Sequence, residues 1–175
     1  YALNIGWPPL PDNPVILTFD DGYTDNYENA YPIIKEMGFT ATFFILTDVT
    51  DRKQPGYMTW DMLREMVQNG MSIQVHGREH LEMTNQTNDW LLFHLLGPVQ
   101  TIEAELGYVP HFIAYPSGKY DENVIATARQ LGYWGGATTI YGSHQQKNHI
   151  FELERLRISG NMSLDYFAAM IEGSK

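Results

Sequence analysis

The sequence predicts an α/β fold in which helices cover a parallel sheet. Two observations support this class: predicted strands and helices alternate along the chain, and the strands are continuously apolar, as in sheets buried on both faces. Polar side chains that can carry chemistry also follow several of the strands. Barrel-type α/β folds form their sites at the carboxyl ends of the strands, so we expect these side chains to share one site.

The first half of the chain contains three predicted strands, each a short run rich in apolar and β-branched residues. They are Val15–Phe19, Ala41–Leu46 and Met71–Val75. The two predicted helices are Asn26–Met37 and Trp60–Asn69. Thr24 or Asp25 caps the first helix and Gly38 stops it, while Thr59 caps the second and Gly70 ends it.

The second half continues the alternation. Its predicted strands are Phe112–Tyr115, Trp134–Thr139 and Leu156–Ser159. Its shorter predicted helices are Glu122–Leu131 and Ser163–Ile171. A longer helical region starts at Asn88 or Asp89 and ends at Leu106, and Gly97-Pro98 in its middle predicts a kink or a break.

With 175 residues, the chain is long enough to form one domain with a buried core. We expect the proline-rich residues 1–14 to form an extended lead-in and residues 15–175 to form a single catalytic domain. No apolar stretch approaches the roughly 20 residues that a membrane span needs. No signal peptide is recognisable, and we expect that a leader or anchor has been removed.

The formal net charge of −10 constrains the partners of this chain. No basic stripe is present to neutralise phosphates, which argues against a nucleic-acid partner. The acidic balance instead suits neutral or cationic substrates. Because the chain has no cysteines, any bound metal must be held by histidine and carboxylate side chains.

Two adjacent carboxylates, Asp20 and Asp21, end the first predicted strand and precede Gly22. Glycine permits the unusual backbone angles of a sharp turn, so the two carboxylates can approach one point from different directions. One can bind a cation while the other accepts a proton from an activated water. The alternative is a solvated turn, because Asp-Asp-Gly is common in turns.

His76 and His80 follow the third predicted strand, four residues apart. Two histidines and one carboxylate with open coordination positions suit Zn²⁺, and also Co²⁺ or Ni²⁺. Two unrelated loop histidines are the alternative. The combination with Asp20 and Asp21 favours metal-assisted hydrolysis.

The segment Tyr115-Pro116-Ser117-Gly118 is a predicted turn after the fourth strand. It lacks the Gly-x-Ser-x-Gly pattern, which disfavours a serine nucleophile. The backbone N–H of Ser117 can instead stabilise a developing oxyanion, with a plain turn as the alternative. Tyr115, Pro116 and Trp134 are candidate substrate contacts, with core packing as the alternative for the aromatic rings.

His144 and His149 lie in a polar loop and are candidates for the general acid. Ordinary exposed loop histidines are the alternative for both.

These residues resemble the motifs of polysaccharide deacetylases of carbohydrate esterase family four, which share the NodB homology domain. The resemblance covers about residues 15–171 and is closest to the exopolysaccharide and poly-N-acetylglucosamine deacetylase branch. Thr18-Phe19-Asp20-Asp21-Gly22 is identical to the first motif of the family, and His76-Gly77-Arg78-Glu79-His80 resembles its His-x-x-x-His motif. Tyr115-Pro116-Ser117-Gly118 resembles the third motif at its Pro and Gly.

The resemblance implies a distorted (β/α) barrel with fewer than eight units, which removes N-acetyl groups from an N-acetylglucosamine polysaccharide and releases acetate. Asp20 would be the catalytic base, and the backbone N–H of Ser117 would help to hold the oxyanion. One divalent metal ion, Zn²⁺ by preference, would be bound by Asp21, His76 and His80. The resemblance also implies a secreted or cell-surface protein, and we assume a monomer.

The chain departs from the family pattern at several points. Gly77 replaces the usual Ser or Thr after the first histidine, and Ala114 stands where an Arg usually orients the base. The Asp-rich fourth motif and the closing Leu-x-His motif are missing. We therefore expect Arg155 or Arg157 to help to tune the base, and His149 or His144 to serve as the acid.

Two further functions are open on the sequence alone. An O-acetyl esterase acting on xylan or another glycan would need less protonation of its leaving group, which fits the missing closing histidine. A non-catalytic glycan-binding domain of the same fold fits the missing Arg and His, but it does not explain a base beside a metal site. A metallophosphatase usually needs more ligands, for two metal ions.

Overall fold

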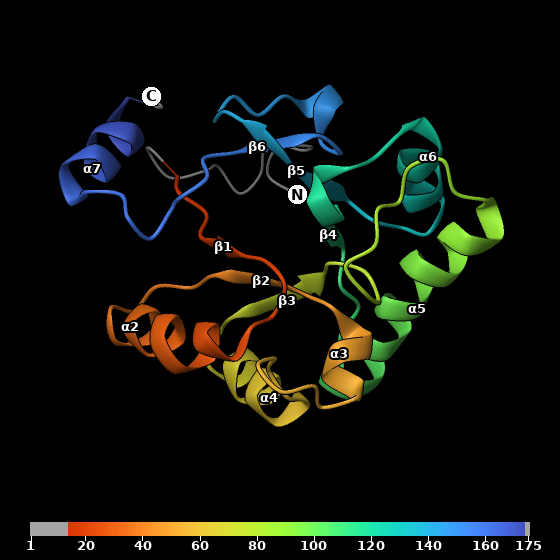
Figure 1. Cartoon of the computed structure of the whole chain (residues 1–175), viewed down its shortest axis with the longest axis horizontal. Helices are drawn as coiled ribbons and strands as arrows, with labels where there is room; N and C mark the ends of the chain where they lie inside the picture. The colour runs from red at the N-terminus through yellow and green to blue at the C-terminus, as the bar shows by residue number, and fades with distance from the viewer. Residues whose placement is uncertain (1–13, 174–175) are drawn as a thin grey trace.

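The computed structural model describes residues 14–173 of the protein. Six parallel strands form one sheet, in which each strand pairs with the next one along the chain. The strands are β1 (Thr18–Phe19), β2 (Thr42–Ile45), β3 (Ser72–Val75), β4 (Phe112–Ala114), β5 (Gly135–Tyr141) and β6 (Leu153–Arg155). The sheet curls into a half-barrel with helices around it (Figure 1). The predicted α/β class and the distorted (β/α) barrel with fewer than eight units are confirmed.

Helices connect the strands and pack around the sheet. They are η1 (Asn26–Ala30, a π-helix), α2 (Tyr31–Glu36), α3 (Thr47–Asp51), α4 (Trp60–Gln68), α5 (Asn88–Leu106), η2 (Pro116–Gly118), α6 (Glu122–Gln130), η3 (Lys147–His149) and α7 (Leu164–Glu172). Side-chain oxygens cap four of them by accepting a hydrogen bond from a backbone N–H in the first turn. These caps are Thr59, Thr87, Asp121 and Ser163. The predicted cap at Thr59 is therefore confirmed.

The first and last strands differ from the prediction. Only Thr18 and Phe19 of the predicted first strand form β1, and the preceding Val15 and Ile16 are exposed. The last strand, β6, begins at Leu153 because that side chain packs against the core, whereas the predicted segment 156–159 is mostly exposed. The predicted lead-in lies, except for Pro14, outside the described residues.

The sequence predicted a kink or a break at Gly97-Pro98, and the break is absent because α5 runs as one helix through both residues. Proline removes one backbone hydrogen bond, but tertiary packing can outweigh that loss. The buried Leu91 and Leu95 precede Pro98, and the buried Ile102 follows it. Both halves of the helix are thus held against the same core.

One main hydrophobic core lies between the sheet and the helices. Strands β2, β3 and β4 and helices α4, α5 and α6 all contribute fully buried side chains to it, among them Phe43, Ile45, Leu63, Ile73, Leu91, Ile113 and Val124. In contrast, α7 has no buried residue and lies at the edge of the molecule (Figure 1). The most deeply buried part of the protein is therefore the part that carries the loops after β2, β3 and β4.

Two side chains join the middle strands, because β3 and β4 pair directly at one residue pair. The Tyr108 hydroxyl accepts a hydrogen bond from the Ile73 N–H (2.8 Å) and donates one to the Ile73 carbonyl (2.7 Å). The Gln74 Oε1 accepts hydrogen bonds from the N–H groups of His111 (2.9 Å) and Phe112 (2.8 Å). Side chains thus satisfy backbone groups that a strand ladder would otherwise pair.

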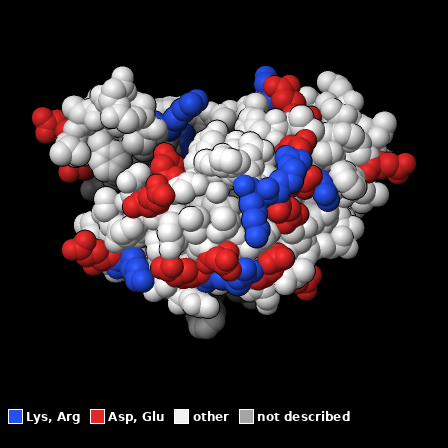
Figure 2. Space-filling view, turned by 60° about the horizontal axis from the view of Figure 1, so that its bottom comes forward, with Lys and Arg blue, Asp and Glu red and all other residues white. Residues whose placement is uncertain are grey.

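No helix between residues 14 and 173 is long and apolar enough to cross a membrane. Acidic and basic side chains are interspersed on the face of the molecule that Figure 2 shows. That face therefore offers no extended basic surface of the kind that binds nucleic acid.

We predict that Tyr108→Phe lowers the free energy of unfolding by about 1–3 kcal/mol, because it leaves the buried N–H and carbonyl of Ile73 without their partner. Chemical denaturation with the metal-free protein measures this change. Tyr166→Phe is the matched control, since Tyr166 is exposed on α7. Equal stability of the two variants would show that the hydroxyl of Tyr108 does not join the strands.

Candidate active site

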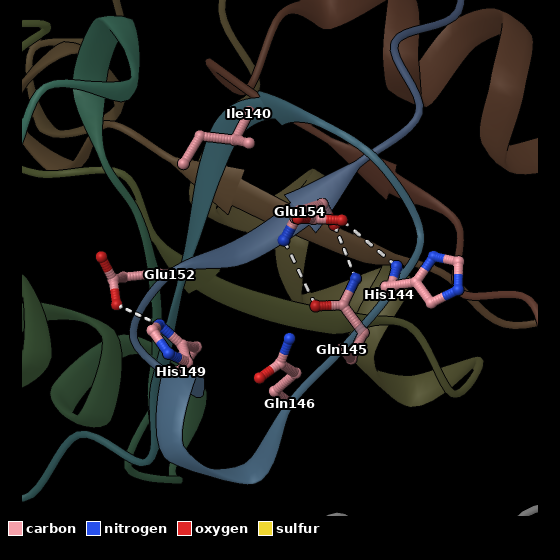
Figure 3. Close-up of a pocket in the computed structure, with 7 residues that line it drawn as sticks. All are labelled: Ile140, His144, Gln145, Gln146, His149, Glu152 and Glu154. Carbon is pink, nitrogen blue, oxygen red and sulfur yellow. Dashed lines mark hydrogen bonds and ion pairs between the residues drawn. The ribbon is translucent and has the colours of Figure 1, made fainter.

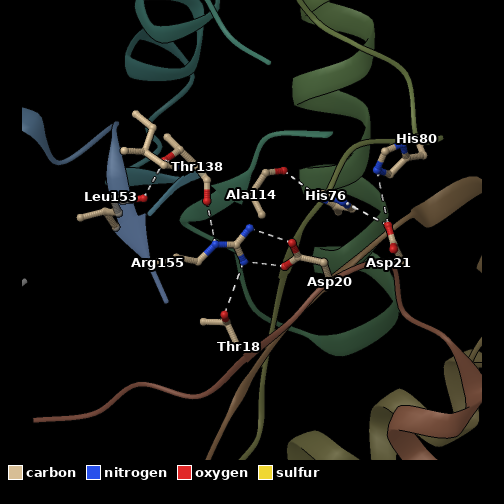
Figure 4. A network of polar contacts seen from close by, with 10 residues as sticks. Thr18, Asp20, Asp21, His76, His80, Ala114, Thr138, Leu153 and Arg155 are labelled. Carbon is tan, nitrogen blue, oxygen red and sulfur yellow. Dashed lines mark hydrogen bonds and ion pairs between the residues drawn. The ribbon is translucent and has the colours of Figure 1, made fainter. Parts of the chain in front are cut away.

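The loop after β1 turns sharply and separates two adjacent carboxylates. Asp21 and Gly22 both have positive φ angles, 71° and 77°. A Cβ at Gly22 would lie 3.2 Å from a side-chain carbon of Ile45, so glycine serves both the backbone angle and the close approach to β2. The turn sends Asp20 and Asp21 in different directions, as expected from the sequence (Figure 4).

Asp20 is held by Arg155, which comes from the end of β6 (Figure 4). The guanidinium donates two hydrogen bonds of 2.8 Å, one to each carboxylate oxygen. Its Nε also donates to the Thr138 carbonyl (2.9 Å), and Nη1 lies 3.4 Å from the Thr18 hydroxyl. A bidentate contact of this kind fixes both the position and the orientation of a carboxylate.

Asp21 faces the two histidines instead. The Nε2 atom of His76 lies 3.2 Å from the Asp21 Oδ1, and the Nε2 of His80 lies 3.7 Å from the same oxygen. His76 is buried at the end of β3, with its Nδ1 2.7 Å from the Ala114 carbonyl. Because a carbonyl can only accept, Nδ1 carries the proton and Nε2 presents its lone pair to Asp21.

These three residues fit a divalent metal ion. The ligand atoms of Asp21, His76 and His80 all lie within 4.8 Å of one another. The Asp21 Oδ1 is buried and has no hydrogen-bond partner among the described residues, so it faces the His76 lone pair unpaired. A cation between these atoms would satisfy both, and the carbonyl behind His76 is the support that metal-bound histidines commonly have.

Asp21 is ionised at neutral pH. When the His76 ring is also protonated at Nε2, its hydrogen bond to the carboxylate holds the pKa of Asp21 below its ordinary value, against the opposing effect of burial, and the charges of His76 and His80 add to the lowering. In the neutral ring, Nε2 offers its lone pair to a cation instead. A carboxylate must be deprotonated to bind a metal, so the charge state of Asp21 suits this role.

The predicted turn after β4 lies beside this group. A Cβ at Gly77, next to His76, would come within 3.8 Å of Pro116. Within the turn, the N–H groups of Gly118 and Lys119 already donate to the carbonyls of Tyr115 and Pro116. Since proline has no N–H, the N–H of the exposed Ser117 is the remaining donor that the turn can offer.

The other candidate substrate contacts are either buried beside this group or far from it. Tyr115 is 1% exposed, donates to the Phe151 carbonyl and stacks on Tyr120, and Pro116 is also buried. Trp134 precedes β5, and its N–H donates to the carbonyl of His111, which precedes β4. Trp134 therefore lies at the amino ends of the strands, whereas the metal-binding group lies at their carboxyl ends.

The two candidate acids line a separate polar pocket of about 210 Å³ (Figure 3). The Nδ1 of His149 pairs with Glu152 at 2.8 Å, and the N–H of His144 donates to Glu154. Along β6, successive side chains point to opposite faces, so Glu154 points away from the face on which Arg155 reaches Asp20. Within residues 14–173, neither histidine contacts Asp21, His76 or His80.

Of the two arginines that the sequence suggested, the structure brings Arg155 to Asp20 and leaves Arg157 exposed. The sequence offers one signal for this choice. If Leu153 faces the core in a strand, period-two alternation turns Arg155 to the same side. The predicted strand at 156–159 contains neither Leu153 nor Arg155, so it does not reveal this alternation.

Comparisons with known proteins indicate the family to which this fold and these motifs are similar. The polysaccharide deacetylase family matches residues 8–135. The Bacillus subtilis (strain 168) protein named "Putative polysaccharide deacetylase YxkH" is 35% identical over 161 residues, which cover 92% of this chain and 57% of that protein. Chitin deacetylase 1 of Cryptococcus neoformans var. grubii is 27% identical over 71% of this chain and 27% of its own length. This chain thus spans well under two thirds of both curated relatives.

A solved deacetylase structure is also similar to this chain. The Streptococcus pyogenes deacetylase PplD in complex with acetate is similar with a TM-score of 0.91 and 32% identity. The likeness covers 97% of this chain and 75% of that chain.

We predict that Asp21→Ala and His80→Ala abolish stoichiometric Zn²⁺ binding, because each removes one of three ligands. Asp20→Asn should keep the metal, since Asp20 is held by Arg155 and lies outside the ligand group. Equilibrium dialysis followed by elemental analysis measures the bound metal. A full equivalent of Zn²⁺ in both ligand variants would contradict the assignment.

Proposed function

This chain belongs to the polysaccharide deacetylase family, and we propose that it is a metal-dependent hydrolase that removes N-acetyl groups from an N-acetylglucosamine-containing polysaccharide. The proposal depends on the observation that the two adjacent carboxylates have different partners. Asp21 faces the histidines, while Asp20 is kept from them by the two hydrogen bonds from Arg155. Binding a glycan needs no such separation, but hydrolysis needs both a metal ligand and a base.

In the proposed reaction, Asp21, His76 and His80 hold one divalent ion, for which Zn²⁺ is the best match to two histidines and a carboxylate. When bound, this ion supplies the positive charge that acidifies water and stabilises a negatively charged oxygen. Asp20 accepts the proton of the attacking water, and Arg155 keeps its carboxylate oriented for that step. The N–H of Ser117 donates a hydrogen bond to the developing oxyanion.

The leaving amine must also receive a proton. His144 and His149 contact residues on the other side of β6, so they are poorly placed to deliver it. Asp20 holds a proton after the first step, and we assign its return to the leaving nitrogen to the same carboxyl group. Acetate and a free amino sugar are the products.

The proposed substrate class is supported by the named relatives. One similar protein is named a chitin deacetylase, and one similar structure is that of a deacetylase in complex with acetate. The net charge of −10 suits a neutral polymer that becomes cationic as amines are released. We propose that the protein is secreted or lies at the cell surface, as its family resemblance implies.

An O-acetyl esterase is the second candidate. The observation that favours it is the position of His144 and His149 away from Asp20, because an alcohol leaves with less protonation than an amine. The same residues would carry both reactions, so the site geometry leaves the choice to experiment.

The test is acetate release by metal-free protein, with and without added Zn²⁺ or Co²⁺, from N-acetylglucosamine oligomers and from acetylated xylan. We expect metal-dependent release from the oligomers. Release from xylan alone would replace the proposal with the esterase. Release from neither substrate, with Zn²⁺ bound and oligomers bound, would favour a glycan-binding domain.

We predict that Asp20→Asn lowers kcat by about 10²- to 10⁴-fold, because it removes the base. Arg155→Lys should lower kcat by about 10- to 100-fold, since lysine keeps the charge but cannot hold both oxygens of Asp20 in one orientation. Both variants should bind Zn²⁺ like the unchanged protein. Steady-state kinetics on oligomers checks this, and an unchanged kcat for Asp20→Asn would exclude it as the base.

A further inference from the structure

We propose that Arg78 is a positioning residue that holds the metal ligand His80 in place, and that Gly97 in helix α5 provides the space for its side chain. The inference deepens the proposed function, because it rests on the metal site described above. It also explains a glycine inside a helix that the function itself does not use.

The two histidine ligands differ in how they are supported. His76 is 2% exposed, continues β3 and has the Ala114 carbonyl at its Nδ1. The side chain of His80 is 44% exposed, and its only polar contact among the described residues is the 3.7 Å approach to Asp21. The position of His80 therefore depends on the loop that carries it.

Helix α3 holds that loop by its backbone. The N–H of Thr47 donates to the Gly77 carbonyl (3.2 Å), and the N–H of Asp48 donates to the Arg78 carbonyl (2.9 Å). The Asp48 carboxylate also pairs with the Nε of Arg78, at 3.1 Å and 3.3 Å to its two oxygens. Both side chains are more than three-quarters buried, so solvent screens this pair less than an exposed one.

Helix α5 holds the other side of the guanidinium. The central carbon of the Arg78 guanidinium lies 4.1 Å from the centre of the Phe93 ring, a cation–π contact. One turn further along the helix, a Cβ at Gly97 would lie 2.6 Å from the Nη1 of Arg78, which is closer than real carbon atoms come. The guanidinium is thus seated against the helix backbone, and an alanine at this position would displace it.

The loop from His76 to His80 is therefore held against α3 by backbone hydrogen bonds and by the Arg52–Glu79 ion pair (2.8 Å). Among the contacts described here, the Arg78 side chain is the one that also reaches α5, and this contact acts as a clamp. Residues that orient metal ligands typically contribute 10- to 100-fold to metal affinity. We expect the clamp to contribute in this range through His80, because His76 has its own support.

The decisive variant is Gly97→Ala. It leaves every charged group in place, and the better helix propensity of alanine offsets part of the cost of disturbing the Arg78 contacts, so the metal-free protein should still fold cooperatively. The displaced guanidinium should nevertheless weaken Zn²⁺ binding by about 10-fold, measured by competition with a chromogenic chelator. Arg78→Met should weaken it by a similar factor.

Two controls separate the clamp from general effects. Arg64→Met removes another arginine that pairs with α5, through Glu105, and should leave Zn²⁺ affinity unchanged. In the double variant of Gly97→Ala and Arg78→Met, the second substitution should add nothing, because both act on the same contact.

Zn²⁺ affinity in Gly97→Ala equal to that of the unchanged protein would overturn the inference, even if Arg78→Met failed to fold. So would additive effects in the double variant. If neither the unchanged protein nor any variant bound Zn²⁺, the metal site itself would be wrong. Because the measurement uses no polysaccharide, a wrong substrate assignment cannot produce either result.

Discussion

The structure depends on one ion pair that spans an open barrel. Strands β1 and β6 are the two edges of the curled sheet, and neither pairs with the other. Arg155 on β6 reaches Asp20 and Thr18 at β1 and is tied back to β5 through the Thr138 carbonyl. The same contact brings together the edges and aims the proposed base, so the geometry of the site and the curvature of the sheet are coupled.

Next to that contact, the two neighbouring carboxylates have opposite electrostatic surroundings. The charge of Asp20 is balanced by a guanidinium, which donates a hydrogen bond to each of its oxygens. Asp21 has a buried oxygen without a hydrogen bond, opposite a histidine whose proton is committed to the other side of the ring. One carboxylate is thus paired within the protein, and the other is left to be paired by a cation. A positive φ at Asp21 is the local strain that makes this division possible.

The sequence was sufficient for features that depend on short segments. Apolar runs predicted most strands, and the adjacency of Asp20, Asp21 and Gly22 predicted a turn that presents two carboxylates. Features that depend on distant partners were harder. Arg155 lies 135 residues from Asp20, and the alternation with Leu153 that distinguishes it from Arg157 is visible only once the strand is placed at 153–155. Likewise, Gly97 and Pro98 predicted a kink or a break in α5. The break is absent because the packing that holds the helix together comes from elsewhere in the chain, as does the arginine seated at Gly97.

The side-chain join between β3 and β4 has a consequence for how such a site can diversify. His76 stands on one side of this seam and the turn with Ser117 on the other. Where two strands are hydrogen-bonded along their whole length, the backbone hydrogen bonds fix the spacing between them. Here Tyr108 and Gln74 set part of that spacing, at a distance from the reacting groups. Substitution at either position can therefore change the spacing between His76 and the turn with Ser117 while the proposed catalytic residues themselves stay the same.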